Sequence, residues 1–374
     1  MAQNVGERLL HTEICDIFDI RYPIMLAGMG GASCPKLVAA ISNAGGLGVL
    51  GAAGCSPDEI DAWIRETRSL TSQPFGIDTL LPARVPEHAP EEGLRSAIPE
   101  AYWKAVEEIR REYNLPEPKD ERGSLPAFTH DFFDKQIEAI MDNNVPVYAA
   151  GLGNPAKYIP EFHRRGTKVI GVVGNVKNAR RVADSGVDVL IAQGHDAGGH
   201  NSRIGTLALI PQGVDAVAGK VPVAAAGGIG DGRGVVATMM LGARGAWIGT
   251  RFLATPEACI PEGQKQAIVA ATEEDTMVSR YLTGKPVRML KTDLPSEFEK
   301  RGLEPLPMPL MGLVSGSLFG GAVSAQRFDL NPGLGGQVIG MIHDIRPPAE
   351  VFEGIVNQAI ALFEQIAAQI AVAQ

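Results

Sequence analysis

Short hydrophobic runs alternate with longer amphipathic stretches along most of this chain. Each run is only a few residues long and is bounded by glycine, proline or polar residues, which is typical of a strand buried in a parallel sheet. The stretches between the runs repeat their apolar positions with the period of a helix. The expected strands are residues 23–26, 47–50, 75–79, 145–150, 168–173, 188–193, 221–226 and 246–249. This succession predicts an α/β protein with a TIM (β/α)8 barrel, although a doubly wound sheet has the same alternation.

Two segments interrupt the alternation. Residues 82–128 contain many prolines and charges around one amphipathic piece at 100–113. An excursion of this length after the third strand is either a solvated surface insertion or a functional cover or partner contact. Residues 256–335 follow the eighth strand, contain many prolines and glycines, and are predicted to form a mostly helical lid. The helical pattern at 349–371 is expected to complete the barrel wall.

These interruptions define the predicted domains. Residues 1–255 and 336–374 form the barrel, with 82–128 inserted in it, and residues 256–335 form a lid or substrate subdomain. The chain has 374 residues, of which 45% are hydrophobic, so it can bury a core of this size.

The charge balance narrows the choice of partners. The chain has 34 Lys and Arg against 43 Asp and Glu, a formal net charge of −9. Nucleic acids and anionic membranes bind basic faces, so we expect neither as a partner. No apolar run approaches the ~20 residues of a membrane span, and the N-terminus lacks the pattern of a signal peptide. We therefore expect a cytoplasmic protein with a small-molecule substrate, and the excursion is a candidate contact for a homo-oligomer.

The four cysteines lie far apart in the sequence and form no CxxC pair. They are Cys15, Cys34, Cys55 and Cys259. This spacing is typical of reduced thiols in a cytosolic protein, and reduced thiols are the prediction here.

Glycines follow the seventh and eighth predicted strands. Gly227 and Gly228 end one strand, and Gly249 and Thr250 end the next. Glycine at a strand end before a helix exposes backbone N–H groups, and the helix dipole there favours an anion. The loops after strands seven and eight are the usual phosphate site of a barrel, so a phosphate site is predicted. The alternative is that these glycines only make tight turns. A dinucleotide fold is not indicated, because GMGGAS has Ser33 where its third glycine would stand.

The sixth predicted strand runs into the loop QGHDAGGH, which contains His195 and His200. Gly198 and Gly199 lie between the histidines and disfavour a helix, so the pair does not have the spacing of a zinc site, and no metal is expected. A histidine beside a phosphate site at a strand end is a candidate general base or hydrogen-bond donor, which we assign to His200. A turn histidine bonded to the backbone is the alternative for both, and it is favoured for His195.

Five motifs occur in this order along the chain: PIMLAGM at 23–29, NAGGLG at 43–48, QGHDAGGH at 193–200, AAGGI at 225–229 and GTRF at 249–252. In combination they resemble the nitronate monooxygenase family, formerly called 2-nitropropane dioxygenases. FMN-dependent enoyl-acyl-carrier-protein reductases and NAD(P)H:quinone reductases are close relatives of that family. The resemblance covers nearly the whole chain except 82–128.

The resemblance implies a TIM barrel that binds non-covalent FMN. The implied cofactor-binding residues are Ala27, Gly28, Met29, Gln193, Gly198, Gly199, Gly227, Gly228, Gly249 and Thr250. His200 matches the histidine expected to act as the acid/base group. The chain departs from the family pattern at Asp78, where relatives usually have asparagine, and at His195. Both are therefore candidate substrate contacts.

The resemblance implies flavin-mediated oxidation of alkyl nitronates with O2. Two alternatives stay open. One is an FMN-dependent reductase that takes hydride from NAD(P)H as co-substrate and delivers it to an enoyl thioester or quinone. The other belongs to a different class, a non-redox barrel that grips a phosphorylated substrate for isomerase or lyase chemistry.

Overall fold

The computed structural model describes residues 5–372 except 83–84, 86, 88–90 and 118–127. Eight parallel strands form one sheet in the order β1-β9-β8-β6-β5-β4-β3-β2. A parallel bridge between Met25 and Leu47 joins β1 to β2 and closes the sheet. The strands are β1 (Ile24–Leu26), β2 (Gly48–Gly51), β3 (Phe75–Leu81), β4 (Val147–Gly153), β5 (Lys168–Val173), β6 (Val189–Gln193), β8 (Val223–Ala226) and β9 (Ala246–Ile248). The predicted TIM barrel is confirmed, with strand ends within three residues of those expected.

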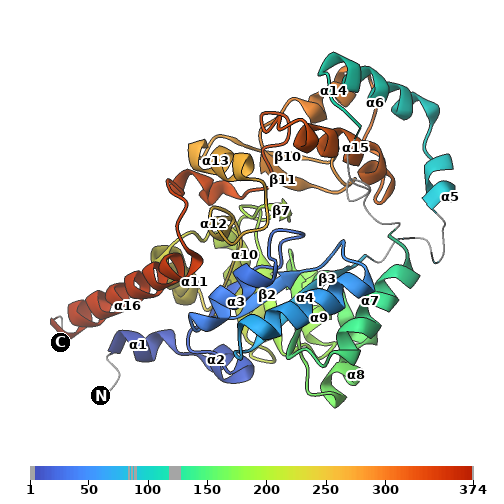
Figure 1. Ribbon diagram of the computed structural model, residues 1–374. Coiled ribbons are helices and arrows are strands. Elements are labelled where there is room, and N and C mark those ends of the chain that lie inside the picture. Colours follow the sequence, from blue (N-terminus) through green and yellow to red (C-terminus); the bar gives the residue numbers. More distant parts are fainter. Residues whose placement is uncertain (1–4, 83–84, 86, 88–90, 118–127, 373–374) are drawn as a thin grey trace.

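Helices surround the barrel strands (Figure 1). They are α3 (Pro35–Asn43), α4 (Pro57–Leu70), α7 (His130–Asp142), α8 (Ile159–Arg164), α9 (Val176–Ala183), α10 (Thr206–Val217), α11 (Gly232–Met240) and α16 (Pro348–Val372), preceded by α1 (Val5–Leu10) and α2 (Glu13–Phe18), and a short turn η2 (Pro155–Lys157) precedes α8. Local caps fix several starts: the Ser56 hydroxyl accepts the Glu59 N–H, and the Glu59 carboxylate accepts the Ser56 N–H. The helix predicted at 349–371 packs against α11, α1 and α3 and completes the wall.

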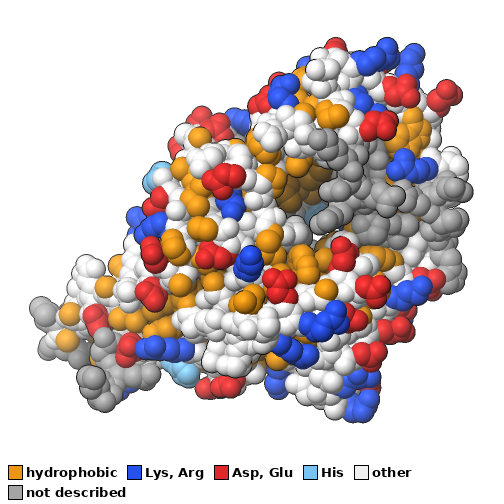
Figure 2. Space-filling view, viewed as in Figure 1, with side chains coloured by type: hydrophobic (Ala, Val, Ile, Leu, Met, Phe, Trp, Pro, Cys, Tyr) orange, Lys and Arg blue, Asp and Glu red, His pale blue; other side chains and the backbone are white. Residues whose placement is uncertain are grey.

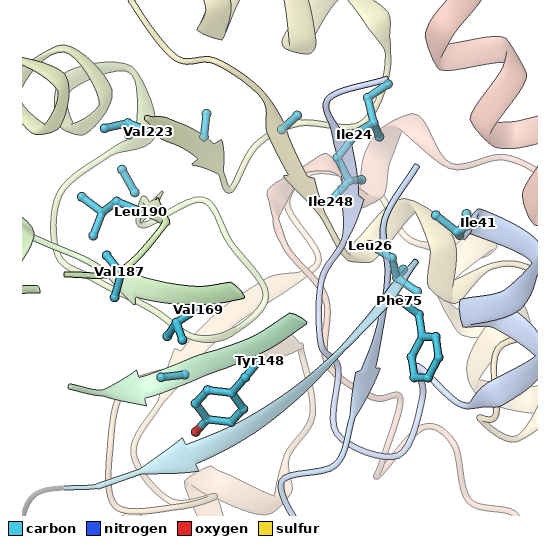
Figure 3. Close-up of a cluster of buried hydrophobic side chains, with 14 of the residues drawn as sticks. Ile24, Leu26, Ile41, Phe75, Tyr148, Val169, Val187, Leu190, Val223 and Ile248 are labelled. Carbon is cyan, nitrogen blue, oxygen red and sulfur yellow. The ribbon is translucent and has the colours of Figure 1, made fainter. Parts of the chain in front are cut away.

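Side chains of successive strand residues alternate between the barrel interior and the layer under the helices. Met25 and Ala224 belong to the interior cluster, whereas Ile24, Leu26 and Val223 pack outward under the helices. Figure 3 shows the outer cluster, with Leu190, Val169 and other strand residues directed between strands and helices. The interior of the barrel is therefore filled by side chains, and the ends of the strands are where a ligand can bind.

The lid (residues 256–335) lies over the C-terminal ends of the strands. It contains α13 (Glu262–Ala270), β10 (Thr276–Ser279), β11 (Val287–Leu290), α14 (Leu294–Lys300) and α15 (Leu310–Ser324), and it is joined to the barrel by α12 (Thr250–Leu253) and η3 (Gln337–Met341). Helices predominate, but β10 and β11 form an antiparallel hairpin that continues into β7 (Gly199–His200) of the QGHDAGGH loop. This pairing ties the lid to the predicted catalytic loop.

The described part of the excursion packs on the lid. It forms α5 (Glu91–Ser96) and α6 (Glu100–Glu112), which Figure 1 shows beside the lid helices and away from the barrel strands. The Tyr102 hydroxyl donates to the Glu304 carbonyl at 2.6 Å, and Ile109 is buried in the cluster that contains Phe298 and Met311. Arg301 of the lid pairs with Glu112 at 2.5 Å. This part of the excursion is thus a second layer of the lid and not a solvated insertion.

The prediction of reduced cysteines is wrong for two of the four. Cys34 and Cys259 form a disulfide with a Cα–Cα distance of 6.0 Å, whereas Cys15 and Cys55 are free. The bond joins the start of α3 to the base of the lid across 225 residues of sequence. The expected cytoplasmic localisation stays a prediction. Among the described residues, no helix has the length and apolar character needed to span a membrane.

Replacing Cys34 with serine is expected to lower stability by about 2–4 kcal/mol, because the crosslink restricts the unfolded chain. Thermal unfolding of oxidised protein, of protein reduced with dithiothreitol, and of the variant measures the effect. The reduced protein and the variant should unfold at the same lower temperature. Cys55→Ser is the matched control and should unfold like the oxidised parent. Equal midpoints for oxidised and reduced parent protein would contradict the crosslink.

Candidate active site

A cavity of about 1170 Å3 lies between the C-terminal ends of the barrel strands and the lid. Figure 2 shows the molecule hollowed between these two parts, with hydrophobic side chains on the wall. The structure brings together every predicted site residue except His195. The cavity is lined by Ala27, Gly28, Met29, Asp78, Gln193, Gly198, Gly199, His200, Gly227, Gly228, Gly249 and Thr250.

The loops after β8 and β9 fit a phosphate group. Gly227 and Gly228 have φ angles of +92° and +73°, a region that favours glycine, and a side chain at either position would be strained. The Thr250 hydroxyl oxygen accepts the Gly336 N–H at 3.0 Å, so its own proton is free to be donated to a ligand. Gly199 has a φ of +71° and open space where a side chain would stand.

Helix α11 does not supply the free N-terminus that the sequence suggested. The carboxylate of Asp231 accepts the N–H groups of Arg233 at 2.9 Å and Gly234 at 3.3 Å and so caps the helix itself. The anion donors on this side of the cavity are therefore the loop N–H groups and Thr250. Asp196 has a similar role at the start of α10, where its carboxylate accepts the Thr206 N–H at 2.7 Å. Burial opposes ionisation of Asp196, but the hydrogen bonds from Thr206 outweigh it and lower its pKa.

His200 is held from both sides. Its backbone pairs with Val287 of the lid strand β11, and its carbonyl accepts the Gln193 side-chain amide at 2.7 Å. Its Nε2 lies 2.9 Å from the Thr283 hydroxyl, whose oxygen also accepts the Lys285 N–H at 3.4 Å. This chain of bonds favours donation by Thr283 to Nε2, which places the imidazole proton on Nδ1. Burial, aided by the positive charge of Lys285, lowers the pKa of His200 to about 4, so the imidazole is neutral at pH 7.

His195 lies outside the cavity lining. Its Nδ1 is 2.7 Å from the carbonyl oxygen of Ser202, and its own carbonyl accepts the Arg288 guanidinium at 3.1 Å. This is the backbone-bonded turn histidine that the sequence offered as the alternative. The geometry gives no support to its predicted substrate contact.

Asp78 occupies the cavity wall on β3 and is only 7% exposed. Its Oδ1 accepts the Gly151 N–H at 2.8 Å. Burial raises the pKa of Asp78 well above its ordinary value, and the Gly151 hydrogen bond offsets this only in part.

Several lining residues carried no signal in the sequence. They are Gly151 at the end of β4, Thr283, Met289, Ser315 and Phe319 of the lid, and Gly335 of the segment returning to the barrel. Each reaches the cavity through lid packing or through the pairing of distant strands. A Gly-rich segment such as NPGLGG at 331–336 is the one pattern that could have indicated a close approach. Within the described residues, no group of three or more His, Cys, Asp or Glu side chains is arranged to hold a metal.

Known proteins resemble this chain over three quarters or more of its length. A putative monooxygenase of Mycobacterium tuberculosis is 34% identical over 377 aligned residues, covering 96% of this chain and 98% of the relative. A probable nitronate monooxygenase of Staphylococcus saprophyticus is 35% identical, covering 76% of this chain and 79% of the relative.

Two solved structures share both fold and sequence. Nitroalkane oxidase from Streptomyces ansochromogenes superposes with a TM-score of 0.78 at 30% identity and covers 95% of this chain and 99% of its own. FabK from Thermotoga maritima superposes with a TM-score of 0.74, also at 30% identity, and covers 96% and 99%. The sequence pattern that defines the nitronate monooxygenase family matches residues 11–358. The chain therefore belongs to the nitronate monooxygenase family and is an oxidoreductase.

Proposed function

We propose that the protein binds FMN and oxidises alkyl nitronates with O2. The phosphate would be held by Gly199, Gly227, Gly228 and Thr250, whose geometry leaves room and donors for an anion. The ring would lie against Ala27 to Met29 and Gln193, at the bottom of the same cavity. When bound, FMN supplies the two-electron chemistry that links substrate oxidation to oxygen. Binding, orientation and proton handling are left to the protein.

The position of His200 in the cavity, with its Nε2 held by the Thr283 hydroxyl, is the observation that carries this proposal. A base whose conjugate acid has a pKa of about 4 removes a proton from the carbon of a neutral nitroalkane only weakly. A nitronate has already lost that proton, so His200 needs only to hydrogen-bond it and to exchange a proton with the product. With Nε2 engaged by Thr283, the Nδ1 proton is the one available for donation. His200 is thus proposed as the acid/base group for an anionic substrate.

The lid contributes by keeping water away. Leu282, Met289, Met308 and Phe319 line the cavity opposite the barrel loops and present apolar surface. Excluding water strengthens each hydrogen bond that His200, Thr283 and Thr250 make to a bound anion.

The activity is expected to depend on the neutral form of His200. With a pKa of about 4, His200 stays neutral from pH 8 down to pH 6, so kcat/KM for freshly prepared nitronate should be constant there and fall only below about pH 5. Lys285→Met removes a positive charge that lowers this pKa, so the decline should begin at higher pH in that variant. A decline centred near pH 6.5 in the parent protein, unaffected by Lys285→Met, would contradict the assignment.

A second function is favoured by the size of the cavity. At about 1170 Å3, the cavity exceeds the usual range of roughly 300–1,000 Å3 for a small-molecule site, and its lid wall is apolar. This space suits an FMN-dependent reductase that uses NAD(P)H on an enoyl thioester or quinone. We propose it as the second candidate function.

Oxygen uptake separates the two functions. We expect rapid O2 consumption with propane-2-nitronate and little with NADH or NADPH alone. Fast oxidation of NADH or NADPH with a quinone or crotonyl thioester, without O2 uptake on nitronate, would favour the reductase and overturn the leading proposal.

A further inference from the structure

Asp78 is a buried carboxyl group that forms no ion pair with any described residue. It lies in the middle of β3 between Gly51 of β2 and Ala149 of β4, and it lines the cavity. Its only hydrogen bond to a described residue is the one that Oδ1 accepts from Gly151. The second carboxyl oxygen, Oδ2, has no partner in the described part of the chain. An ionised carboxylate at such a position would carry a large desolvation cost.

Two glycines form a slot for this carboxyl group. A Cβ at Gly151 would stand 2.6 Å from Oδ1 and 2.8 Å from Oδ2 of Asp78, and a Cβ at Gly28 would overlap Oδ2. Both glycines line the cavity. The carboxyl plane is therefore clamped between two strand ends, with Oδ1 fixed on the Gly151 N–H and Oδ2 directed along Gly28.

The described residues around Asp78 offer no compensating positive charge. On the neighbouring strand β4, Tyr148 is the titratable side chain close to Asp78, and its hydroxyl is bonded to Thr79 at 3.0 Å. Burial raises the pKa of Tyr148, so its hydroxyl is uncharged. Among the described residues, no basic side chain acts on the carboxyl group: burial raises the pKa of Asp78, and the Gly151 N–H opposes this.

We propose that Asp78 is an uncharged carboxylic acid and that its Oδ2 hydroxyl donates a hydrogen bond to the ring of the bound flavin. Oδ1 is the acceptor of the Gly151 N–H, so the proton resides on Oδ2, the oxygen beside Gly28. In this role Asp78 is a positioning residue that presents a donor to the cofactor without a negative charge. The inference rests on the proposed function, because it requires a flavin at this wall.

The charge state is tested by stability against pH in the parent protein and in Asp78→Asn. In the unfolded chain an aspartic acid ionises near pH 3.9. In the folded chain Asp78 stays protonated to a much higher pH, so folding must retain a proton that the unfolded chain has released. Below about pH 4 Asp78 is protonated in both states, and its protonated form makes its whole contribution to the free energy of unfolding. That contribution declines as the pH rises from about 4 toward the pKa of Asp78 in the folded protein.

Asp78→Asn cannot ionise and does not show this loss. The unfolding equilibrium constant of the parent, relative to that of Asp78→Asn, should rise by up to about tenfold for each pH unit between pH 5 and pH 7. Denaturant unfolding of the two proteins at a series of pH values measures it. A ratio that does not change with pH would show that Asp78 is ionised in the folded protein and would overturn the proposal.

The donor role is tested by FMN affinity. Asn and Leu match the branching of Asp, but only Asn keeps a donor toward the cavity and an acceptor for Gly151. Asp78→Asn should bind FMN within about threefold of the parent, whereas Asp78→Leu should bind it about tenfold or more weakly. Fluorescence titration of the apoprotein with FMN gives the values. Equal affinities for parent and Asp78→Leu would overturn the donor role while leaving the proposed function intact. If the parent protein binds no FMN at all, both the proposed function and the donor role are wrong. The pH dependence of unfolding still decides the charge state of Asp78.

Discussion

Replacing His200 with alanine is expected to lower turnover of a nitronate by about 10²–10⁴-fold while FMN stays bound. His200 lies at the cavity with Nε2 on Thr283, and its backbone is fixed by Gln193 and by strand β11. The alanine variant keeps the backbone pairing, so the flavin site should be undisturbed. Steady-state kinetics and the flavin absorbance of the same sample measure the two quantities.

His195→Ala is the matched control for this variant. His195 belongs to the same loop but lies outside the cavity lining and bonds the Ser202 carbonyl. It should retain turnover close to that of the parent. If His195→Ala loses as much activity as His200→Ala, the effect comes from the loop as a whole, and His200 is not the acid/base group. Parent-like turnover in His200→Ala would also contradict the assignment.

Replacing Gly228 with valine is expected to weaken FMN binding by about 100-fold or more. Gly228 has a φ of +73°, and its Cβ would stand 3.3 Å from the Cβ of Asp196 at the wall of the cavity. A β-branched residue is unfavourable in this backbone region, and relieving the strain would move the N–H groups that are proposed to hold the phosphate. The loss of about 2.7 kcal/mol that such a change implies is comparable to the loss of two hydrogen bonds. Equilibrium dialysis against FMN measures the affinity.

Gly219→Val is the control that separates the effect of backbone strain on stability from the effect of the loop geometry on FMN binding. Gly219 has a similar φ of +75°, open space around it, and no place in the cavity lining. This variant should lose stability by a similar amount but bind FMN like the parent. If Gly228→Val purifies with a full complement of FMN, the assignment of the phosphate to the Gly227–Gly228 loop is wrong.

The barrel could be predicted from the sequence because each of its strands and helices is marked by a local pattern of apolar and capping residues. Runs such as 169–173 and 189–192 contain no polar side chain. The helices between the strands begin at residues such as Ser56 and Asn175, which cap through their own side chains. The strand-end glycines and His200 could also be predicted from local sequence, because each follows directly after a predicted strand. Their position relative to a strand fixes which end of the barrel they occupy.

The features that escaped prediction depend on contacts between distant segments. The strands β10 and β11 are four residues each and are defined by pairing with one another and with Gly199–His200. The disulfide joins two cysteines that are 225 residues apart in the sequence. They come together because the lid packs against the barrel. The pairing of His200 with β11 also decides which histidine faces the cavity.

The absorbance spectrum of the purified protein, followed by anaerobic addition of a nitronate, tests the central claim most directly. The protein is expected to show the two visible bands of an oxidised flavin, and propane-2-nitronate should bleach them without NADH or NADPH. A colourless protein that does not take up FMN would contradict the assignment of the cavity. A yellow protein bleached by NADH or NADPH but not by nitronate would contradict the proposed reaction.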